Sequence, residues 1–276
     1  MYPDTETGQI DSFTVAFTSL SAKSSSGEDQ LTPSGYAAAA ILDSGTTITL
    51  LPNDIVDLVY EELGATVSEE LDAVVVPCSL ADHDGTINYG FGGTGGPVIE
   101  VAVSQLVLPL YLENGEIPQY TNGEDACQLG IEAAGDLPVL FGDTFLRSAY
   151  VVYDLINNRI ALAQTDFNST GSNIVPFASS GAEIPSATLA PSQAAVTQTG
   201  TGIPRGGEVT ATGSASGEAT YNPTQATLSA AAGFTSTSTS TSAAAVGPAP
   251  FEWIRVVVGG VCLALMGVGG GVFVWL

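Results

Sequence analysis

The sequence predicts a mostly β fold with one or two short helices, followed by a long segment that adds little to a core. Two observations carry this prediction. Alternating or continuous apolar runs of strand length are separated by glycine-rich breaks, and only one stretch has helical spacing. We expect strands at residues 14–17, 73–76, 86–91, 98–103 and 106–112. The length of 276 residues allows one or two domains, and the uneven composition reduces this to one, residues 1–177.

Two turns are predicted between these strands. Five glycines within residues 90–96 predict a hairpin turn, because they lack the GxxxxGK[ST] pattern and the following helix of a phosphate loop. Asn157-Asn158 predicts a second hairpin, between the apolar runs 149–154 and 159–163.

The helical stretch covers residues 52–64. Ile55, Leu58, Val59 and Leu63 fall on one face, Pro52 suits the start, and Gly64 suits the end. The acidic side chains of this stretch, Asp57, Glu61 and Glu62, are expected on the face that meets water.

The charge balance excludes nucleic acid and anionic lipid as partners. Residues 1–177 hold 25 of the 29 acidic residues and three of the five basic ones. Such a surface repels polyanions. It is consistent with a protein that functions at acidic pH and with an ordinary acidic secreted protein, and both interpretations remain open.

The single histidine argues against two other classes of site. His83 lies in Asp-His-Asp-Gly, which predicts a surface turn rather than the base of a Ser-His-Asp hydrolase. No cysteine belongs to a CxxC pair, so no metal site is expected. Cys78 and Cys127 are expected to form a disulfide if the chain is exported, and Cys262 is expected to stay unpaired.

The stretch Ile41-Leu42-Asp43-Ser44-Gly45-Thr46-Thr47-Ile48-Thr49-Leu50-Leu51-Pro52 is the candidate site. An Asp-Ser-Gly alone is usually a turn. Here apolar runs flank it on both sides, which places a carboxylate between two buried strands. A charge in such a place must be hydrogen-bonded, and three hydroxyls stand beside it.

A second stretch makes the interpretation specific. Leu137-Pro138-Val139-Leu140-Phe141-Gly142-Asp143-Thr144-Phe145-Leu146-Arg147 is followed by Ala149 to Asp154 and by Asn157 to Ala163. Together with the Asp43 stretch, roughly residues 10–166 resemble the C-terminal lobe of a pepsin-like (family A1) aspartic protease. The overall layout is most similar to that of the fungal yapsin-like, glycosylphosphatidylinositol (GPI)-anchored endopeptidases.

The resemblance implies a role for each residue of the site. Asp43 would be a catalytic carboxyl that activates water. Ser44 and Gly142 would support it, and Gly45, Thr46 and Thr47 would contact the backbone of a peptide or protein substrate. Asp143 would be a supporting residue, Arg147 and Asp154 would be structural ion-pair partners, and Cys78–Cys127 would be the disulfide of the lobe. Neither metal nor organic cofactor is implied.

The chemistry of this family needs two carboxyls. At about 3 Å two carboxylates repel by about 5 kcal/mol at an effective dielectric of 20, so only one ionises. We find no second Asp-Thr/Ser-Gly and no signal peptide at Met1. We therefore expect a truncated product that lacks its N-terminal lobe and is silent alone. The alternatives are a protease active as a homodimer and a non-catalytic cell-surface or wall module.

The rest of the chain predicts where the molecule resides. Residues 178–250 hold 24 Ser and Thr and four charged residues, which predicts a disordered, glycosylated stalk. Asn168 begins the single N-glycosylation sequon. Residues 251–276 are an apolar tail without a basic residue after Arg255, which favours a GPI signal over a transmembrane helix. The predicted attachment region is Ser242, Ala243 and Ala244, which places the protein on the outer face of the plasma membrane or in the cell wall.

Overall fold

The computed structural model describes residues 1–4, 8–10, 12–196 and 228–235. Its strands are β1 (Thr14–Ser24), β2 (Gly27–Gln30), β3 (Ala38–Leu42), β4 (Thr49–Leu51), β5 (Thr66–Ser68), β6 (Ala73–Pro77), β7 (Gly85–Phe91), β8 (Val98–Ala102), β9 (Val107–Leu108), β10 (Ala126–Leu129), β11 (Ile131–Ala133), β12 (Val139–Phe141), β13 (Ala149–Asp154) and β14 (Arg159–Gln164). Its helices are α1 (Asn53–Leu63), α2 (Asp143–Leu146), α3 (Ala231–Thr235) and the 3-10 turns η1 (Cys78–Asp82) and η2 (Val103–Gln105). The mostly β prediction is confirmed, and we call residues 14–164 the β unit.

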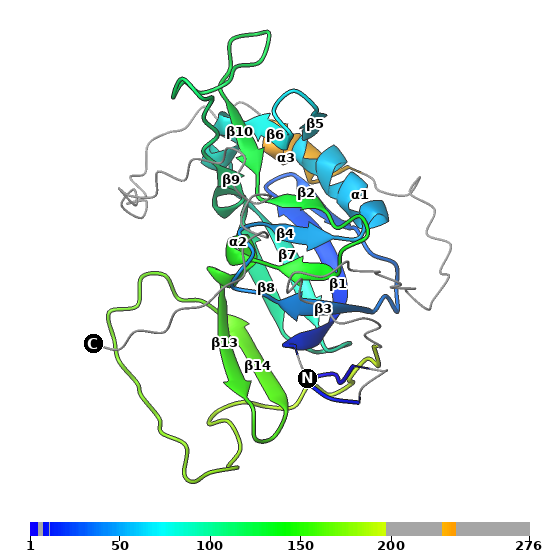
Figure 1. The fold of residues 1–276 in the computed structure, drawn as a ribbon, viewed down its shortest axis with the longest axis vertical. Coiled ribbons are helices and arrows are strands. Elements are labelled where there is room, and N and C mark those ends of the chain that lie inside the picture. Colours follow the sequence, from blue (N-terminus) through cyan, green and yellow to red (C-terminus); the bar gives the residue numbers. More distant parts are fainter. Residues whose placement is uncertain (5–7, 11, 197–227, 236–276) are drawn as a thin grey trace, which may run out of the picture.

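An eight-stranded sheet forms the centre of the β unit (Figure 1). The strand order is β11-β4-β12-β3-β1-β7-β8, with β2 paired to β1. β1 pairs with β2, β3 and β7, so it organises most of the sheet. Four fully buried rings, Phe17, Tyr89, Phe141 and Phe145, pack edge-to-face or tilted against one another behind it.

Strand β12 is inserted into the sheet between two strands that are consecutive in sequence. β3 and β4 are neighbours in sequence, but β12 lies between them, parallel to β3 and antiparallel to β4. All three strands are short; β4 is fully buried, and β3 and β12 are buried toward their C-terminal ends. The turn that joins β3 to β4 must therefore pass over the end of β12, and it is held there by the residues that follow β12.

Helix α1 confirms the helix prediction, with Gly64 ending it at φ 65° in the left-handed region. Its buried face includes Ile55, Leu58 and Leu63. Glu62 was expected to meet water, and that expectation is wrong. It is fully buried, because α3 packs across this end of the helix.

The predicted strands are found with shifted ends. The glycines of residues 90–96 form the hairpin turn between β7 and β8, and Asn157-Asn158 forms that between β13 and β14, as predicted. The strand expected over 106–112 is wrong for most of its length: η2 precedes it and only β9 pairs with β10. Pro109 has no N–H to donate, so the ladder ends at Leu108.

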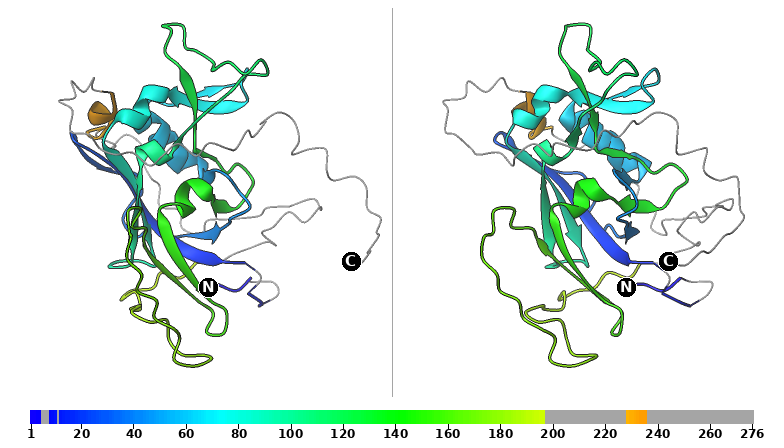
Figure 2. Two further views of the ribbon diagram at one scale, coloured as in Figure 1. Left: turned by 90° about the vertical axis from the view of Figure 1, so that its left-hand side faces the viewer. Right: turned by 60° about the vertical axis from the view of Figure 1, so that its left-hand side comes forward.

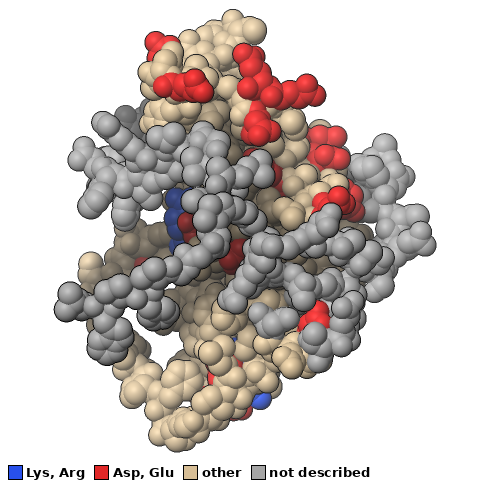
Figure 3. All heavy atoms as spheres, viewed as in Figure 1, with Lys and Arg blue, Asp and Glu red and all other residues tan. Residues whose placement is uncertain are grey.

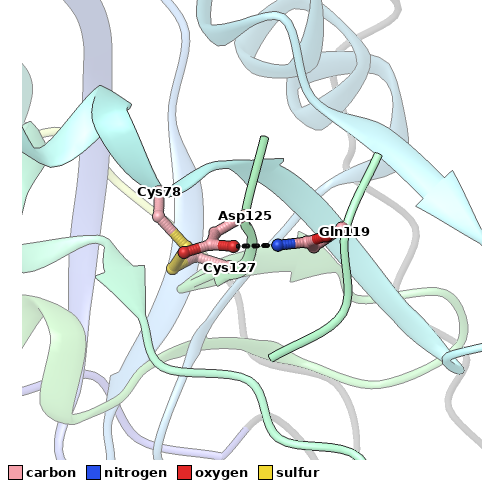
Figure 4. Close-up of a disulfide and its surroundings, with 4 residues drawn as sticks. All are labelled: Cys78, Gln119, Asp125 and Cys127. Atoms are coloured by element: carbon pink, nitrogen blue, oxygen red, sulfur yellow. Dashed lines mark hydrogen bonds between the residues drawn. A yellow bond between two sulfur atoms is a disulfide. The ribbon is translucent and has the colours of Figure 1, made fainter. Parts of the chain in front are cut away.

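A disulfide joins Cys78 to Cys127, as predicted (Figure 4). It links the start of η1 to β10, with 4.9 Å between the Cα atoms. The Nε2 of Gln119 donates to Asp125 at 2.9 Å beside it, which ties the loop before β10 to the same place.

The β13–β14 hairpin forms a two-stranded sheet of its own, whose strand β14 lies beside β8 of the eight-stranded sheet (Figure 2). Its outward side chains are unusually apolar: Tyr150, Leu155 and Ile156 are each 66% exposed. Phe13 stacks on Tyr153 at a centroid distance of 4.4 Å and is itself exposed.

Two parts of the predicted stalk contact the β unit. Residues 178–196 run along its surface, where Ala194 donates to Gly92 O at 2.8 Å and Glu183 pairs with Arg159 at 3.3 Å. Residues 228–235 bury Ala230 and Phe234 completely or nearly so. The sequence analysis expected residues 178–250 to form a disordered stalk, and residues 228–235 depart from this because Phe234 fills a gap in the β unit.

The remaining stalk, the apolar tail and the predicted attachment region at Ser242, Ala243 and Ala244 lie outside the described residues, as does Cys262. In the part of the chain that the structure describes, no helix is long and apolar enough to cross a membrane.

Candidate active site

Asp43 lies directly after buried strand β3, beside the end of the neighbouring strand β12. Its backbone N donates to the carbonyl of Phe141 at 3.0 Å, which continues the β3–β12 pairing by one residue. The side chain is half-buried. The position therefore combines a rigid backbone with partial access to solvent.

The carboxylate is held by its own loop. The backbone N–H of Gly45 donates to Oδ1 at 2.9 Å, and the Thr46 hydroxyl donates to Oδ2 at 2.6 Å. Each oxygen has a further lone pair available to water or to another carboxyl. Ser44, Gly45 and Thr47 are exposed around it, so the hydroxyls of Ser44 and Thr47 and the carbonyl of Gly45 can meet a ligand.

Residues after β12 fix the loop from the other side. The N–H of Asp143 donates to Thr46 O at 2.9 Å, and that of Thr144 donates to Thr47 O at 3.1 Å. Gly142 directly precedes these two residues, at a place where a Cβ would overlap the backbone carbonyls of Thr46 and Ile48. The glycine is thus needed for close approach of two backbones.

A buried hydroxyl pair lies behind the loop, and the sequence analysis missed it. Thr49 and Thr144 are fully buried, with their hydroxyl oxygens 3.1 Å apart, and Thr144 donates to Gly130 O at 2.8 Å. The pair ties β4, α2 and the residue before β11 together. The signal was a threonine inside each of two apolar runs.

Arg147 and Asp154, which the resemblance implied to be ion-pair partners, have other contacts. The Arg147 guanidinium donates to the carbonyls of Asp143 and Gln105 at 3.3 and 3.2 Å. Asp154 accepts from the side chain and backbone of Asn157 at 2.7 and 3.0 Å, and these bonds lower the pKa of its carboxyl. Because the hairpin turn places Asn157 next to Asp154, the local partner satisfies the carboxylate. The side chain of Asp143 is exposed.

His83 is not the free surface turn that its sequence suggested. It caps η1, is half-buried, and donates from Nδ1 to Gly233 O at 3.2 Å. Among the described residues, no cluster of three or more His, Cys, Asp and Glu could hold a metal ion.

Acidic side chains dominate the charged surface. On the face in Figure 3 they gather over the α1 end of the molecule, with few basic side chains beside them. The whole chain carries a formal charge of −24 at pH 7. A field of this sign repels polyanions and attracts cationic groups.

Comparison with known proteins decides the family. The family model described as "Eukaryotic aspartyl protease" matches residues 7–165, more than half of the chain. The chain belongs to the eukaryotic aspartyl protease family. It is 42% identical over 185 residues to the probable aspartic-type endopeptidase opsB of Aspergillus oryzae, a match covering 67% of this chain and 36% of that protein.

This eukaryotic aspartyl protease is also similar to the yapsin group, as its sequence indicated. It is 34% identical to the aspartic proteinase yapsin-3 of Saccharomyces cerevisiae over 55% of this chain and 27% of that protein. The crystal structure of the aspartic proteinase from Irpex lacteus matches with a TM-score of 0.41 and 24% identity, over 58% of this chain and 45% of that one. The chain therefore spans less than half the length of these relatives.

Proposed function

We propose that this chain supplies one of the two catalytic carboxyls, Asp43, of an aspartic-type endopeptidase. The observation that supports the proposal is the Asp43 loop itself. A half-exposed carboxylate with one donor on each oxygen is pinned by three backbone hydrogen bonds to the segment 141–144. This arrangement fixes the position of a carboxyl to the precision that acid–base catalysis needs.

The second carboxyl comes from outside the described residues. In the described part of the chain, the two oxygens of Asp43 bond to Gly45 and Thr46 and to no second carboxyl. We propose that an N-terminal lobe carries the partner. One ionised carboxyl takes a proton from water, and the resulting hydroxide attacks the scissile carbonyl carbon. The protonated carboxyl donates its proton to the carbonyl oxygen.

The exposed hairpin supports such a partner lobe. Tyr150, Leu155 and Ile156 on β13–β14 expose two thirds of their surface, and Phe13, Tyr153 and Leu137 are exposed as well. Monomeric proteins rarely leave a large apolar patch open. We propose that this hairpin packs against the lobe that brings the second carboxyl, with Ser44 at the contact between the two.

Substrate and location follow the same proposal. The exposed Gly45 carbonyl and Thr47 hydroxyl would bind the backbone of an extended peptide, while the Gly45 N–H and the Thr46 hydroxyl are engaged with Asp43. The Cys78–Cys127 disulfide supports an oxidising, exported setting. Asn168 is exposed in a turn after β14, where an oligosaccharide would have room. GPI attachment near Ser242 is part of this proposal.

The test is peptide cleavage at acidic pH by the chain joined to the part of its A. oryzae relative that the match, 36% of that protein, does not cover. We expect cleavage by this joined enzyme and none by the chain alone. Asp43→Asn should abolish activity, and Asp57→Asn, which removes an exposed acid on α1, should keep it.

Two results would revise the proposal. Full activity of the Asp43→Asn enzyme would refute the role of Asp43. Cleavage by the chain alone that rises with the square of its concentration, together with a dimer in sedimentation, would replace the partner lobe with a second copy.

A further inference from the structure

A short segment from beyond the β unit is docked on it, far from Asp43 in sequence. Residues 228–235 end in α3, which packs against α1 and β1 (Figure 1). Ala230 is fully buried and Phe234 is 3% exposed. The ring of Phe234 fills the space over Gly85, where a Cβ would overlap it. We call residues 228–235 the latch.

Hydrogen bonds fix the latch at both ends. The backbone N–H of Ala230 donates to Asp29 Oδ2 at 2.7 Å, and the Ser24 hydroxyl donates to Ala230 O at 2.7 Å. At the other end His83 Nδ1 donates to Gly233 O at 3.2 Å. The partners come from β2, β1 and the residue after η1, so the latch joins three elements of the β unit.

A buried acid lies under the latch. Glu62 is fully buried and neither oxygen has a hydrogen-bond partner in bonding geometry. Two ionisable groups face it, the Asp29 carboxyl from β2 and the Glu61 carboxyl on its own helix. The backbone amide of Ala231 also faces it, and this amide favours the charged form of Glu62. Helix α3 carries no ionisable side chain. Burial and the Asp29 charge raise the pKa of Glu62 to about 7.

We propose that residues 228–235 form a pH-sensitive latch, which ties the chain after the β unit onto α1 at acidic pH and releases it as the pH approaches neutral. Two carboxyls meet beneath it. Asp29 accepts a hydrogen bond from the latch through the Ala230 N–H, and the charged side chains described around Glu62, Asp29 and Glu61, are both acidic, so a negative charge at Glu62 is repelled there. The latch is therefore compatible with a protonated Glu62 and strained by an ionised one. This inference is independent of the role proposed for Asp43.

The direction follows from proton linkage. In the docked state the pKa of Glu62 lies near 7, and in the released state, exposed to water, it falls toward the ordinary value of 4.5. The docked state thus binds the proton more tightly. Its advantage is complete below about pH 4.5, declines through the window up to about pH 7, and is lost above it.

Release would lengthen the tether. With the latch docked, residues 228–235 are held at the α1 face. With the latch released, the last described contacts with the β unit are those of residues 178–196. A protein held at a surface beyond residue 235 would then reach farther at neutral pH than at acidic pH.

The experiment is hydrogen–deuterium exchange of the full chain between pH 5 and pH 8, corrected for intrinsic exchange rates. It follows the Ala230 and Gly233 amides, which are bonded to Asp29 and to Ala230 O. We expect protection of these amides to fall about tenfold or more between pH 5 and pH 8. Peptides from β7 serve as the internal reference and should not change.

Two variants make the test decisive. Glu62→Gln keeps the shape without the charge, so the latch should stay protected at both pH values. Phe234→Ala should leave the latch unprotected at both, while β7 stays protected. Protection that does not vary with pH in the natural chain, or a Glu62→Gln chain that loses protection as the natural one does, would overturn the proposal.

Discussion

At the scale of single residues, the Asp43 site depends on close backbone contacts more than on side chains. The loop is bonded to segment 141–144 through the N–H groups of Asp43, Asp143 and Thr144. Only Gly142 lets these backbones approach. The strands on either side of Asp43 and the need for Gly142 could be predicted from the sequence, because each lies in a contiguous motif. The Thr49–Thr144 pair could not, since its members lie 95 residues apart.

Gly142→Ala should lower the free energy of unfolding by about 2 to 3 kcal/mol, the cost of forcing a methyl group into a closely packed site. The added Cβ would overlap the carbonyls of Thr46 and Ile48. Urea unfolding measures the change. Gly171→Ala is the matched control, because nothing lies within 4 Å of its Cβ position. Equal stability of the two variants would mean that the loop is not packed as described.

Thr144→Val should cost about 1 to 3 kcal/mol of stability, because it leaves the Gly130 carbonyl and the Thr49 hydroxyl without this partner in a buried place. Thr144→Ser keeps the hydroxyl and should recover part of the loss. Thermal unfolding compares both with Thr121→Val, which alters an exposed threonine in a turn. A valine variant as stable as the control would refute the contribution of this pair.

At the scale of elements, the local sequence pattern predicts most strands, α1 and both hairpins. It does not predict which other elements pack against them. The apolar face of α1 could be predicted because its apolar residues recur at helical spacing. The burial of Glu62 was not predicted, because its cover comes from residues 228–235, more than 160 positions away. The short β9 was missed for a local reason, the effect of Pro109 within an apolar run.

The Cys78–Cys127 disulfide closes a loop across η1 and the small sheet, with a sequence separation of 49. Replacing both cysteines by serine should lower the free energy of unfolding by about 4 kcal/mol in the chain-entropy model. Denaturant titration with and without a reductant measures this. The natural chain should lose stability on reduction, and the double variant should be indifferent to it. A natural chain that is equally insensitive would contradict the assignment.

At the scale of the whole molecule, two surfaces point to contacts beyond the β unit. The β13–β14 hairpin exposes aromatic and aliphatic side chains, which supports a second lobe beside it. The latch on α1 ties the distal chain back to the β unit. The resemblance of sequence motifs to one lobe anticipated the first surface. The second could not be anticipated, because the composition of residues 178–250 gives no sign that Phe234 has a site to fill.

The central claim is that Asp43 shares a proton with a second carboxyl during peptide hydrolysis. The most direct measurement is kcat/KM against pH for the chain joined to the proposed N-terminal lobe. The account predicts a bell-shaped profile in the acid range, because activity needs one carboxyl ionised and the other protonated. It predicts that Asp43→Asn abolishes this profile and Asp57→Asn leaves it in place. A profile with a single limb, or one unchanged by Asp43→Asn, would contradict it.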